Sequence, residues 1–308
     1  MVEIPLYQVD AFTDRVMRGN PAAVCPLPSW LPDGLMQAIA WENNLPETAF
    51  IVGGDGRYDL RWFTPATEVD LCGHATLAAA YVVLTHLEEG RNEVVFRSAG
   101  GPLAVTRSGD LLSLTFPALP YDKAVPPENL LRGLGPVPPA EVYRSMDYIA
   151  VYETEQQLRA IVPDQRLLGT LDLRGVVVTA PADDTTPWDL TAAGADSASG
   201  DVTMPGAGTG PAAGIDFCSR FFGPKLAIPE DPITGSAHCA LVPYWAGRLD
   251  RTRLRARQLS PRLGETQAID LDCALVGDRV RMSGGARQYL AGTIRLTPDD
   301  LRHHDRSN

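Results

Sequence analysis

The sequence lacks the features of membrane, secreted and nucleic-acid-binding proteins. No apolar run approaches the roughly 20 residues of a membrane-spanning helix, and Glu3, Asp10 and Asp14 stand where a signal peptide would be basic and then apolar. Basic residues are outnumbered, 27 against 38 acidic ones, and the formal charge of -11 offers no electrostatic footprint for nucleic acid or an anionic membrane. We therefore expect a soluble, cytoplasmic protein with neither a nucleic-acid nor a membrane partner.

Cysteine is also scarce, and its arrangement argues against a disulfide-stabilised protein. The five cysteines are odd in number, scattered and never spaced as CxxC, which indicates reduced thiols rather than a disulfide framework. The chain contains no GxSxG elbow, no P-loop and no histidine cluster with metal-ligand spacing. Serine hydrolase, ATPase and zinc enzyme are thus weak interpretations, and we expect no metal.

What is present is typical of a folded protein of two domains. The chain has 308 residues, 44% of them hydrophobic, and domains average roughly 150 residues. We predict an N-terminal half at residues 1–118 and a C-terminal half at residues 119–295, with the crossover in the proline-rich segment 117–139. Whether residues 296–308 return to the first half is left open.

The apolar patterning predicts short strands interrupted by a few helices. The predicted helices cover residues 33–44, 75–84 and 154–162. The predicted strands cover residues 4–12, 22–26, 48–52, 58–64, 92–97, 101–106, 111–116, 148–152, 175–180, 267–271, 279–283 and 291–296. Residues 191–214 are rich in Ala, Gly, Ser, Asp and Pro, so we expect a mobile surface loop there.

One stretch, residues 61–80 (RWFTPATEVDLCGHATLAAA), places a polar turn between a predicted strand and an apolar helix. Cys72, Gly73 and His74 therefore fall at a helix N-terminus. The unpaired N–H groups and the positive end of the helix dipole at such a place bind carboxylates. A small anionic ligand is expected at this position.

A second stretch repeats this pattern. SRFFGPKLAIPEDPITGSAH in the second half shares R-x-F-x-P, an acid, and a small-residue turn into an Ala-containing helix. The distance from Pro65 to Gly73 is 8 positions and that from Pro224 to Gly235 is 11, which fits a three-residue insertion. We interpret the two stretches as an ancient duplication that brings two helix N-termini to one interdomain cleft.

Several residues in these stretches have both a structural and a catalytic interpretation. Glu47 is either a solvated strand-edge charge or a general acid/base, since partial burial raises a carboxyl pKa toward neutrality. His74 either fills a polar niche or acts beside the anion seat, and Cys72 is either a structural thiol or a base. Asp231, before a proline, and Ser236, at the next helix start, either cap that helix or bind a ligand.

Several motifs in the same order together resemble the phenazine biosynthesis isomerase-like (PhzF-like) family, within the diaminopimelate epimerase-like fold. The resemblance runs nearly end to end. It rests on DAFTDRVMRGNPAAV, NLPETAF, RWFTPATEVDLCGHAT, SRFFGPKLAIPEDPITGSAH and the closing AGTIRL. It implies an α+β fold of two pseudo-symmetric domains, each a mixed β-sheet curled around a central α-helix.

The resemblance also implies a function and a site. It implies a cofactor-independent isomerase, usually a homodimer, that moves a proton and a double bond in a small carboxylate-bearing metabolite. Carried over by motif, the acid/base would be Glu47, with His74 and Asp231 as further catalytic residues. The substrate-binding residues would be Asn20, Cys72, Gly73, Thr234, Gly235 and Ser236.

Two departures bear on the chemistry. Diaminopimelate epimerases and proline racemases carry a cysteine at both helix starts, whereas this chain has Cys72 at one and Thr234 at the other. One-base isomerisation through Glu47 is therefore favoured over two-thiol racemisation. Pro46 stands where serine is more usual in the family, which affects a local hydroxyl contact and the substrate rather than the fold. The alternatives are a non-catalytic binding or structural protein on this fold and, ranked lower, an epimerase or dehydratase of a small amino or hydroxy acid.

Overall fold

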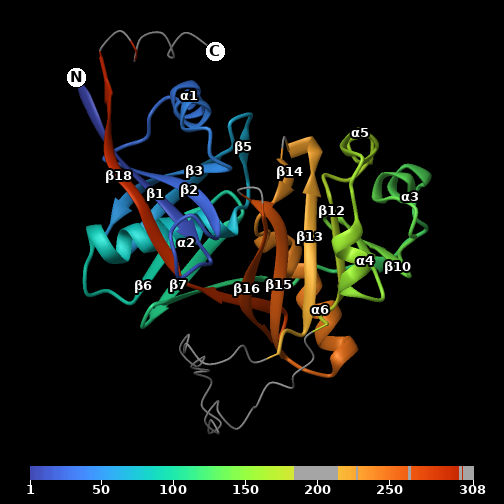
Figure 1. The fold of residues 1–308 in the computed structure, drawn as a ribbon. Coiled ribbons are helices and arrows are strands. Elements are labelled where there is room, and N and C mark those ends of the chain that lie inside the picture. Colours follow the sequence, from blue (N-terminus) through green and yellow to red (C-terminus); the bar gives the residue numbers. More distant parts are fainter. Residues whose placement is uncertain (184–213, 227, 263–264, 298–299, 301–308) are drawn as a thin grey trace, which may run out of the picture.

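The computed structural model describes residues 1–183, 214–226, 228–262, 265–297 and 300. These residues form two halves that lie side by side, each built as a sheet wrapped around one helix (Figure 1). Among the described residues no helix is both long enough and apolar enough to span a membrane. The predicted loop at residues 191–214 lies, apart from Gly214, outside the described residues.

The first half wraps a sheet around helix α2 (Gly73–Val82), which continues as a π-helical turn, η1 (Val83–Leu87). Helix α1 (Asp33–Asn43) packs on the outside of this sheet. The strands of this half are β1 (Val2–Ala11), β2 (Asn20–Leu27), β3 (Glu47–Gly54), β4 (Arg57–Phe63), β5 (Glu68–Val69), β6 (Glu93–Ser98), β7 (Gly101–Ser108), β8 (Leu111–Pro117) and β18 (Ala286–Leu296).

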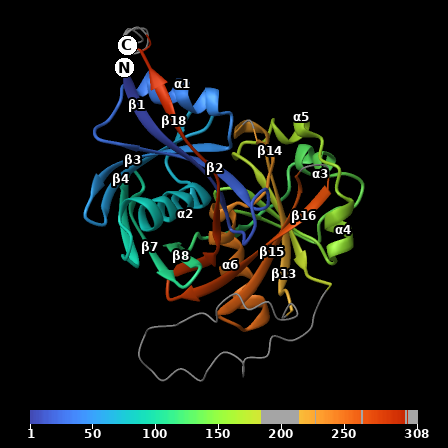
Figure 2. The same ribbon diagram turned by 60° about the vertical axis from the view of Figure 1, so that its left-hand side comes forward.

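The second half wraps its sheet around helix α6 (Gly235–Leu249) (Figure 2). Its outer helices are α3 (Glu128–Leu134), α4 (Glu155–Ala160), α5 (Gln165–Leu168) and the 3-10 turn η2 (Pro224–Leu226). Its strands are β9 (Asp122–Lys123), β10 (Glu141–Arg144), β11 (Tyr148–Val151), β12 (Val176–Pro181), β13 (Phe217–Gly223), β14 (Ile228–Asp231), β15 (Arg253–Arg262), β16 (Glu265–Val276) and β17 (Arg279–Gly284).

The two halves repeat one pattern of strand pairing. Neighbouring strands run β8-β7-β6-β4-β3-β2-β1-β18 in the first half and β17-β16-β15-β13-β12-β11-β10-β9 in the second. In both orders the third and fifth pairings are parallel and the others antiparallel. The short strands β5 and β14 pair with the matching strands β4 and β13. The predicted fold of two pseudo-symmetric α+β halves is confirmed.

Each central helix is largely buried because most of its residues are small or apolar. In α2, each residue from Gly73 to Ala80 is buried, and the small side chains of its alanine run allow the curled sheet to close around it. In α6, Trp245 stacks on Phe217 of β13, with ring centroids 5.5 Å apart and planes inclined by 8°. Burial of such large rings is a main source of stability for this half.

The end of the described chain returns to the first half. Strand β18 pairs with β1 from Ala286↔Ala11 to Leu296↔Val2, so both terminal strands lie side by side (Figure 1). Strands β8 and β17 join the two sheets across the middle. From this pairing we propose that the chain returns to the first half at Ala286, earlier than the position 296 considered from the sequence. We also propose that the boundary between the halves lies between residues 118 and 119, in the connection from β8 to β9.

Candidate active site

The two central helices meet at their N-termini. Cys72 is the N-cap of α2 and Thr234 is the N-cap of α6, as the sequence repeat predicts, and neither side chain caps its own helix. A Cβ placed on Gly73 would lie 3.5 Å from the Gly235 Cα, so the two glycines face each other closely. Uncapped first-turn N–H groups and two positive dipole ends therefore converge on one place.

Glu47 and His74 face each other beside this junction. Glu47 opens strand β3 and is 8% exposed, while His74 lies in the first turn of α2 and is 4% exposed. The Glu47 Oε2 and His74 Nε2 atoms are 3.0 Å apart. Apart from this contact, neither atom has a hydrogen-bond partner among the described residues. The contact is thus an ion pair with spare hydrogen-bonding capacity.

Asn20, the first residue of β2, bridges the two halves at the same point. Its Nδ2 donates to Asp231 Oδ1 at 2.7 Å and to the Ile233 carbonyl at 3.2 Å, and it lies 3.2 Å from His74 Nδ1. An amide nitrogen has two hydrogens, which the two oxygens accept. The fully buried Asn20 Oδ1 has no partner in the described part of the chain.

Three buried polar atoms of this cluster are therefore unsatisfied within the described structure: Asn20 Oδ1, Glu47 Oε2 and His74 Nε2. Buried polar groups are almost always hydrogen-bonded, and a cluster of exceptions calls for an explanation. A polar ligand that enters the site would supply the missing partners.

The electrostatics of the cluster follow from its burial. Burial alone lowers the pKa of His74, but the neighbouring Cys72 and Glu47 groups outweigh it and raise that pKa well above its ordinary value. Burial raises the pKa of Asp231 to about 6; His74 and the hydrogen bonds from Thr234 and Asn20 lower it, and Glu47 raises it further. The site thus combines an imidazole that favours its charged form with a carboxyl group that titrates near neutrality.

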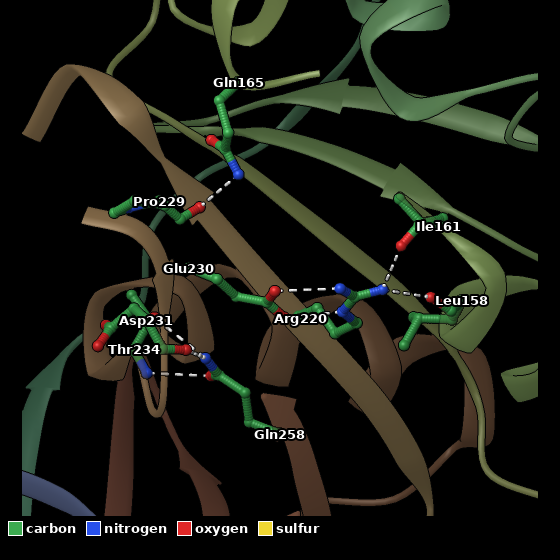
Figure 3. A network of polar contacts seen from close by, with 9 residues as sticks. All are labelled: Leu158, Ile161, Gln165, Arg220, Pro229, Glu230, Asp231, Thr234 and Gln258. Atoms are coloured by element: carbon green, nitrogen blue, oxygen red, sulfur yellow. Dashed lines mark hydrogen bonds and ion pairs between the residues drawn. The ribbon is translucent and has the colours of Figure 1, made fainter. Parts of the chain in front are cut away.

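Two neighbours of Asp231 orient its carboxyl group (Figure 3). The Thr234 hydroxyl donates to Asp231 Oδ2 at 2.6 Å. The side chain of Gln258 in β15 accepts from the Thr234 N–H at 3.0 Å through Oε1, and its Nε2 donates to the Asp231 carbonyl at 2.8 Å and to the Thr234 hydroxyl at 3.2 Å. Gln258 is fully buried, so this amide holds the turn that carries Asp231.

The strand β14, which ends at Asp231, is anchored from its other side. Arg220 in β13 forms a double ion pair with Glu230, with Nε–Oε1 at 2.8 Å and Nη2–Oε2 at 3.0 Å. The Gln165 side chain donates to the Pro229 carbonyl at 3.0 Å (Figure 3). Asp231 therefore projects from a strand whose two preceding residues are fixed.

Gln258 was not among the residues proposed from the sequence. In the alternating segment from Leu254 to Gln258, Leu254, Ala256 and Gln258 are buried, whereas the arginines between them are partly exposed. A polar amide on the buried face of a strand is the signal that could have identified it.

Cys72 and Ser236, both proposed from the sequence as substrate-binding, make other contacts. The Cys72 Sγ lies 3.6 Å from His74 Nδ1, and burial, reinforced by Glu47, raises the pKa of its thiol. This is opposite to the lowered pKa of a thiolate base. The Ser236 hydroxyl, in the first turn of α6, accepts from Arg174 at 2.6 Å, so it is already engaged by a residue of the second half.

The set of side chains in the described structure that could hold a metal ion is Glu47, Cys72 and His74, whose donor atoms lie within 4.8 Å of one another. The thiol approaches Nδ1 of the imidazole, whereas the carboxylate approaches Nε2. A single ion can bind only one of these ring nitrogens, so an ion held by all three side chains would replace one of these two contacts.

Comparison with known proteins gives a consistent result over the whole chain. The family described as phenazine biosynthesis-like protein matches residues 9–292. An uncharacterized isomerase of Pseudomonas aeruginosa is 44% identical over 295 residues, covering 96% of this chain and all of the relative. A solved PhzF-family phenazine biosynthesis protein of Enterococcus faecalis has a TM-score of 0.80 at 40% identity, covering 96% of this chain and 100% of that one.

A more distant structural neighbour extends the fold relationship. A probable proline racemase of Agrobacterium radiobacter has a TM-score of 0.57 at 10% identity, covering 98% of this chain and 95% of that one. At this identity the likeness concerns the fold alone. It supports the diaminopimelate epimerase-like arrangement expected from the sequence.

Proposed function

Because the chain belongs to the phenazine biosynthesis-like family, we propose that it is an isomerase that moves a proton and a double bond within a small carboxylate-bearing metabolite. The observation that carries the proposal is the buried Glu47, in contact with His74 beside two facing helix N-termini. In this arrangement a general acid/base, Glu47, lies next to a carboxylate-binding site formed by the N–H groups at the N-termini of α2 and α6. It is a fitting place to remove a proton from a carbon adjacent to a carboxylate.

In the proposed reaction the substrate carboxylate binds at the first-turn N–H groups of α2 and α6. Glu47 takes a proton from the carbon next to the carboxylate, and the C–H electron pair is delocalised into the carboxylate and over the existing double bond. When the protonated Glu47 returns the proton to the far carbon, these electrons form the new C–H bond there and leave the double bond one position nearer the carboxylate. The product has the composition of the substrate, so no electrons leave the molecule and no redox cofactor is required.

The other residues of the cluster have supporting roles in this scheme. The negative charge that develops on the substrate carboxylate is stabilised by the helix N-termini at Gly73 and Gly235, where donors are already oriented. His74, favoured in its charged form, lies 3.0 Å from Glu47 through its Nε2 and fixes the position of that carboxylate beside the helix N-termini. Asn20 and Asp231 fix the position of the His74 imidazole relative to the bound substrate, because they link the two halves at this point.

Thr234 is the reason to prefer isomerisation over racemisation. A two-base racemase needs an acid/base on each face of the substrate, and the position opposite Cys72 is a threonine hydroxyl that donates to Asp231. A hydroxyl with an ordinary pKa far above neutrality is a poor proton acceptor. An epimerase or dehydratase therefore ranks below the isomerase.

The test is deuterium incorporation. Unsaturated carboxylic, amino and hydroxy acids are incubated with the enzyme in deuterated water and analysed by mass spectrometry. We expect label in at least one acid and a loss of at least about 100-fold in rate for Glu47→Gln, the lower range for general acid/base catalysis. Glu89→Gln removes an exposed carboxylate and serves as the matched control.

The alternative is a binding protein on the same fold, and the same experiment separates it. Label in no acid, combined with tight calorimetric binding of one of them, would assign the chain to that class. Retention of full exchange in Glu47→Gln would contradict the role of Glu47 while leaving an isomerase.

Two further aspects of the proposal concern the oligomeric state and the cellular location. We propose a homodimer from the family resemblance, which light scattering after size-exclusion chromatography would test. We propose the cytoplasm as its location because all five cysteines are free and buried.

A further inference from the structure

A cleft of about 790 Å³ draws its walls from both halves of the molecule. It lies outside the acid cluster, by which we mean Asn20, Glu47, His74 and Asp231. The first half contributes the end of α1 and the turn that follows, including Trp41 and Leu45, and the second contributes β14, including Ile228. A volume of this size is within the range of pockets that enclose small organic ligands.

The cleft borders the proposed active site. Three prolines that line it, Pro21, Pro46 and Pro232, are each adjacent in sequence to a residue of the acid cluster, namely Asn20, Glu47 and Asp231. A substrate whose carboxylate lies at the helix N-termini would therefore extend its far end into this cleft. Pro46 gives the wall on that side an apolar ring.

The walls of the cleft are mainly apolar, and its charge is negative. Of its two carboxylates, Glu230 is already paired with Arg220, and Glu42 is exposed. No Lys, Arg or His is among the described residues that line it. A second carboxylate or a phosphate would thus meet apolar groups and a like charge, without a cation to compensate its desolvation.

Trp41 gives the cleft its most distinctive surface. Its side chain is 68% exposed, although tryptophan has a large apolar area that is favourable to bury. An aromatic ring at the edge of an apolar cleft can stack against a flat or branched apolar group of a ligand. Such a contact would bury part of the indole that water now covers.

From these observations we propose that the outer cleft is a specificity pocket for the distal end of the substrate. The substrate class is a monocarboxylate with an uncharged, apolar distal group, such as an aromatic ring, that packs against Trp41. This inference rests on the proposed function, since it places the substrate carboxylate at the helix N-termini, and it narrows the class of metabolite.

The experiment compares three probes that differ only at the distal end: 4-phenylbut-3-enoate, 3-hexenoate and glutaconate, which carries a second carboxylate. Calorimetry on Glu47→Gln avoids turnover during the measurement. The phenyl acid is expected to bind at least tenfold more tightly than glutaconate, with 3-hexenoate between them. In the same background Trp41→Ala should weaken phenyl-acid binding about tenfold, whereas Trp41→Phe should restore most of it.

Two further variants make the test specific. Trp30→Ala removes another partly exposed tryptophan, one that does not line the cleft, and should leave all three affinities unchanged. Glu42→Lys should improve glutaconate binding severalfold, because it replaces the like charge at the cleft by an opposite one. Equal or tighter binding of glutaconate by the unaltered cleft, or an unchanged phenyl-acid affinity in Trp41→Ala, would overturn the proposal.

Failure of the inference can be told from failure of the proposed function. Deuterium uptake by the wild-type enzyme without any preference for the apolar acid would refute the specificity pocket and leave the isomerase intact. A clear preference for the apolar acid without uptake would refute the reaction and leave the pocket.

Discussion

Asn20 and Asp231 are 211 positions apart in the sequence, yet the amide of the first donates to the carboxyl group of the second at 2.7 Å. Asn20 opens a strand of the first half, and Asp231 closes a strand of the second. The hydrogen bond is fully buried and lies next to His74. The site is therefore shared between the halves, and neither half contains the complete set of groups.

Asn20→Ala is expected to lower the deuterium-exchange rate strongly while reducing stability moderately. Asp231 would lose a donor in a buried place, which costs roughly 1–3 kcal/mol in the free energy of unfolding. The two halves would also lose their register at the site. Parallel measurement of exchange and urea unfolding checks this, with Asn129→Ala, which removes an exposed side-chain hydrogen bond, as control. Wild-type exchange in Asn20→Ala would show that the bridge is purely structural.

Gln258→Leu should shift the titration of Asp231 as well as destabilise the fold. The change leaves the Thr234 N–H and the Asp231 carbonyl without their side-chain partner, at roughly 1–3 kcal/mol each. Without Gln258, the Thr234 hydroxyl is no longer held in place to donate to the Asp231 carboxylate. The ionised form of Asp231 is then less stable, so its pKa rises. The acid limb of the exchange rate should then move to higher pH.

The control for Gln258→Leu is Gln165→Leu, which removes a hydrogen bond to the Pro229 carbonyl on the same strand without touching Thr234. In Gln165→Leu, the acid limb of the pH–rate profile for deuterium exchange should stay at the wild-type pH. A Gln258→Leu enzyme that is less stable but keeps the wild-type pH profile would limit Gln258 to a structural role.

The exchange rate of the wild-type enzyme should fall as the pH decreases through about 6. Asp231 accepts hydrogen bonds on both carboxyl oxygens, which fits its ionised form, and its pKa is raised from 3.8 to about 6. Protonation would displace one of these donors and disturb the site. In Asp231→Asn the overall rate should be lower, and this acid limb should be absent.

Stability should respond to Asp231 in the opposite sense. Since the folded-state pKa lies above the unfolded value, the folded state holds the proton more tightly between pH 3.8 and 6. The contribution of Asp231 to stability is fully present below that window and is lost as the pH rises through about 6. In thermal melts from pH 4 to 7, the Tm of Asp231→Asn should rise relative to the Tm of the wild type as the pH increases. A constant difference across that range would refute the raised pKa.

The sequence predicted most of the elements around the site because their signals are local. The strand before Cys72 and the helix after it follow from alternation and from a run of helix formers. The same holds for the second copy of the motif, and the structure has both helices beginning at the predicted glycines, Gly73 and Gly235. The placement of Glu47 at the start of a strand is also confirmed.

Other elements could not be predicted because their local signals are weak. Helix α3 lies in the segment interpreted as an unpatterned crossover, since it has seven residues between prolines and is too short for a helical period to stand out. Strand β15 was missed because its arginines mask the apolar alternation of Leu254 and Ala256. Contacts such as Gln258 to Thr234 depend on this strand and on the closure of the sheet around α6.

Cys72→Ser is expected to retain most of the exchange activity, and a chelator should have no effect. Burial and Glu47 raise the pKa of this thiol, which disfavours its use as a base, and in our proposal Glu47 carries the proton. Exchange after dialysis against EDTA tests the alternative that Glu47, Cys72 and His74 hold a metal ion. Loss of activity with EDTA, restored by zinc, would require a metal-dependent mechanism instead. Loss in Cys72→Ser without a metal effect would make the thiol a second proton carrier.

Gly73→Ala is the sharpest probe of the carboxylate seat between the two helices. The added Cβ would meet Gly235 Cα at 3.5 Å and the Phe116 ring at 3.6 Å, which are ordinary contact distances, so the fold should be retained. The methyl group would, however, occupy space where the substrate carboxylate approaches the N–H groups. We expect KM to rise at least tenfold, with a smaller change in kcat and little change in Tm.

Gly247→Ala is the matched control, because this glycine lies near the other end of α6 with nothing within 4 Å of an added Cβ. Alanine is the better helix former, so this variant should be equally or slightly more stable and have an unchanged KM. If Gly73→Ala left KM at the wild-type value while its Tm also stayed constant, the carboxylate would have to bind elsewhere in the cleft. The facing helix N-termini would then stabilise charge on another part of the substrate. The substrate would lie in the site with its two ends exchanged, so that its carboxylate points away from Gly73 and Gly235.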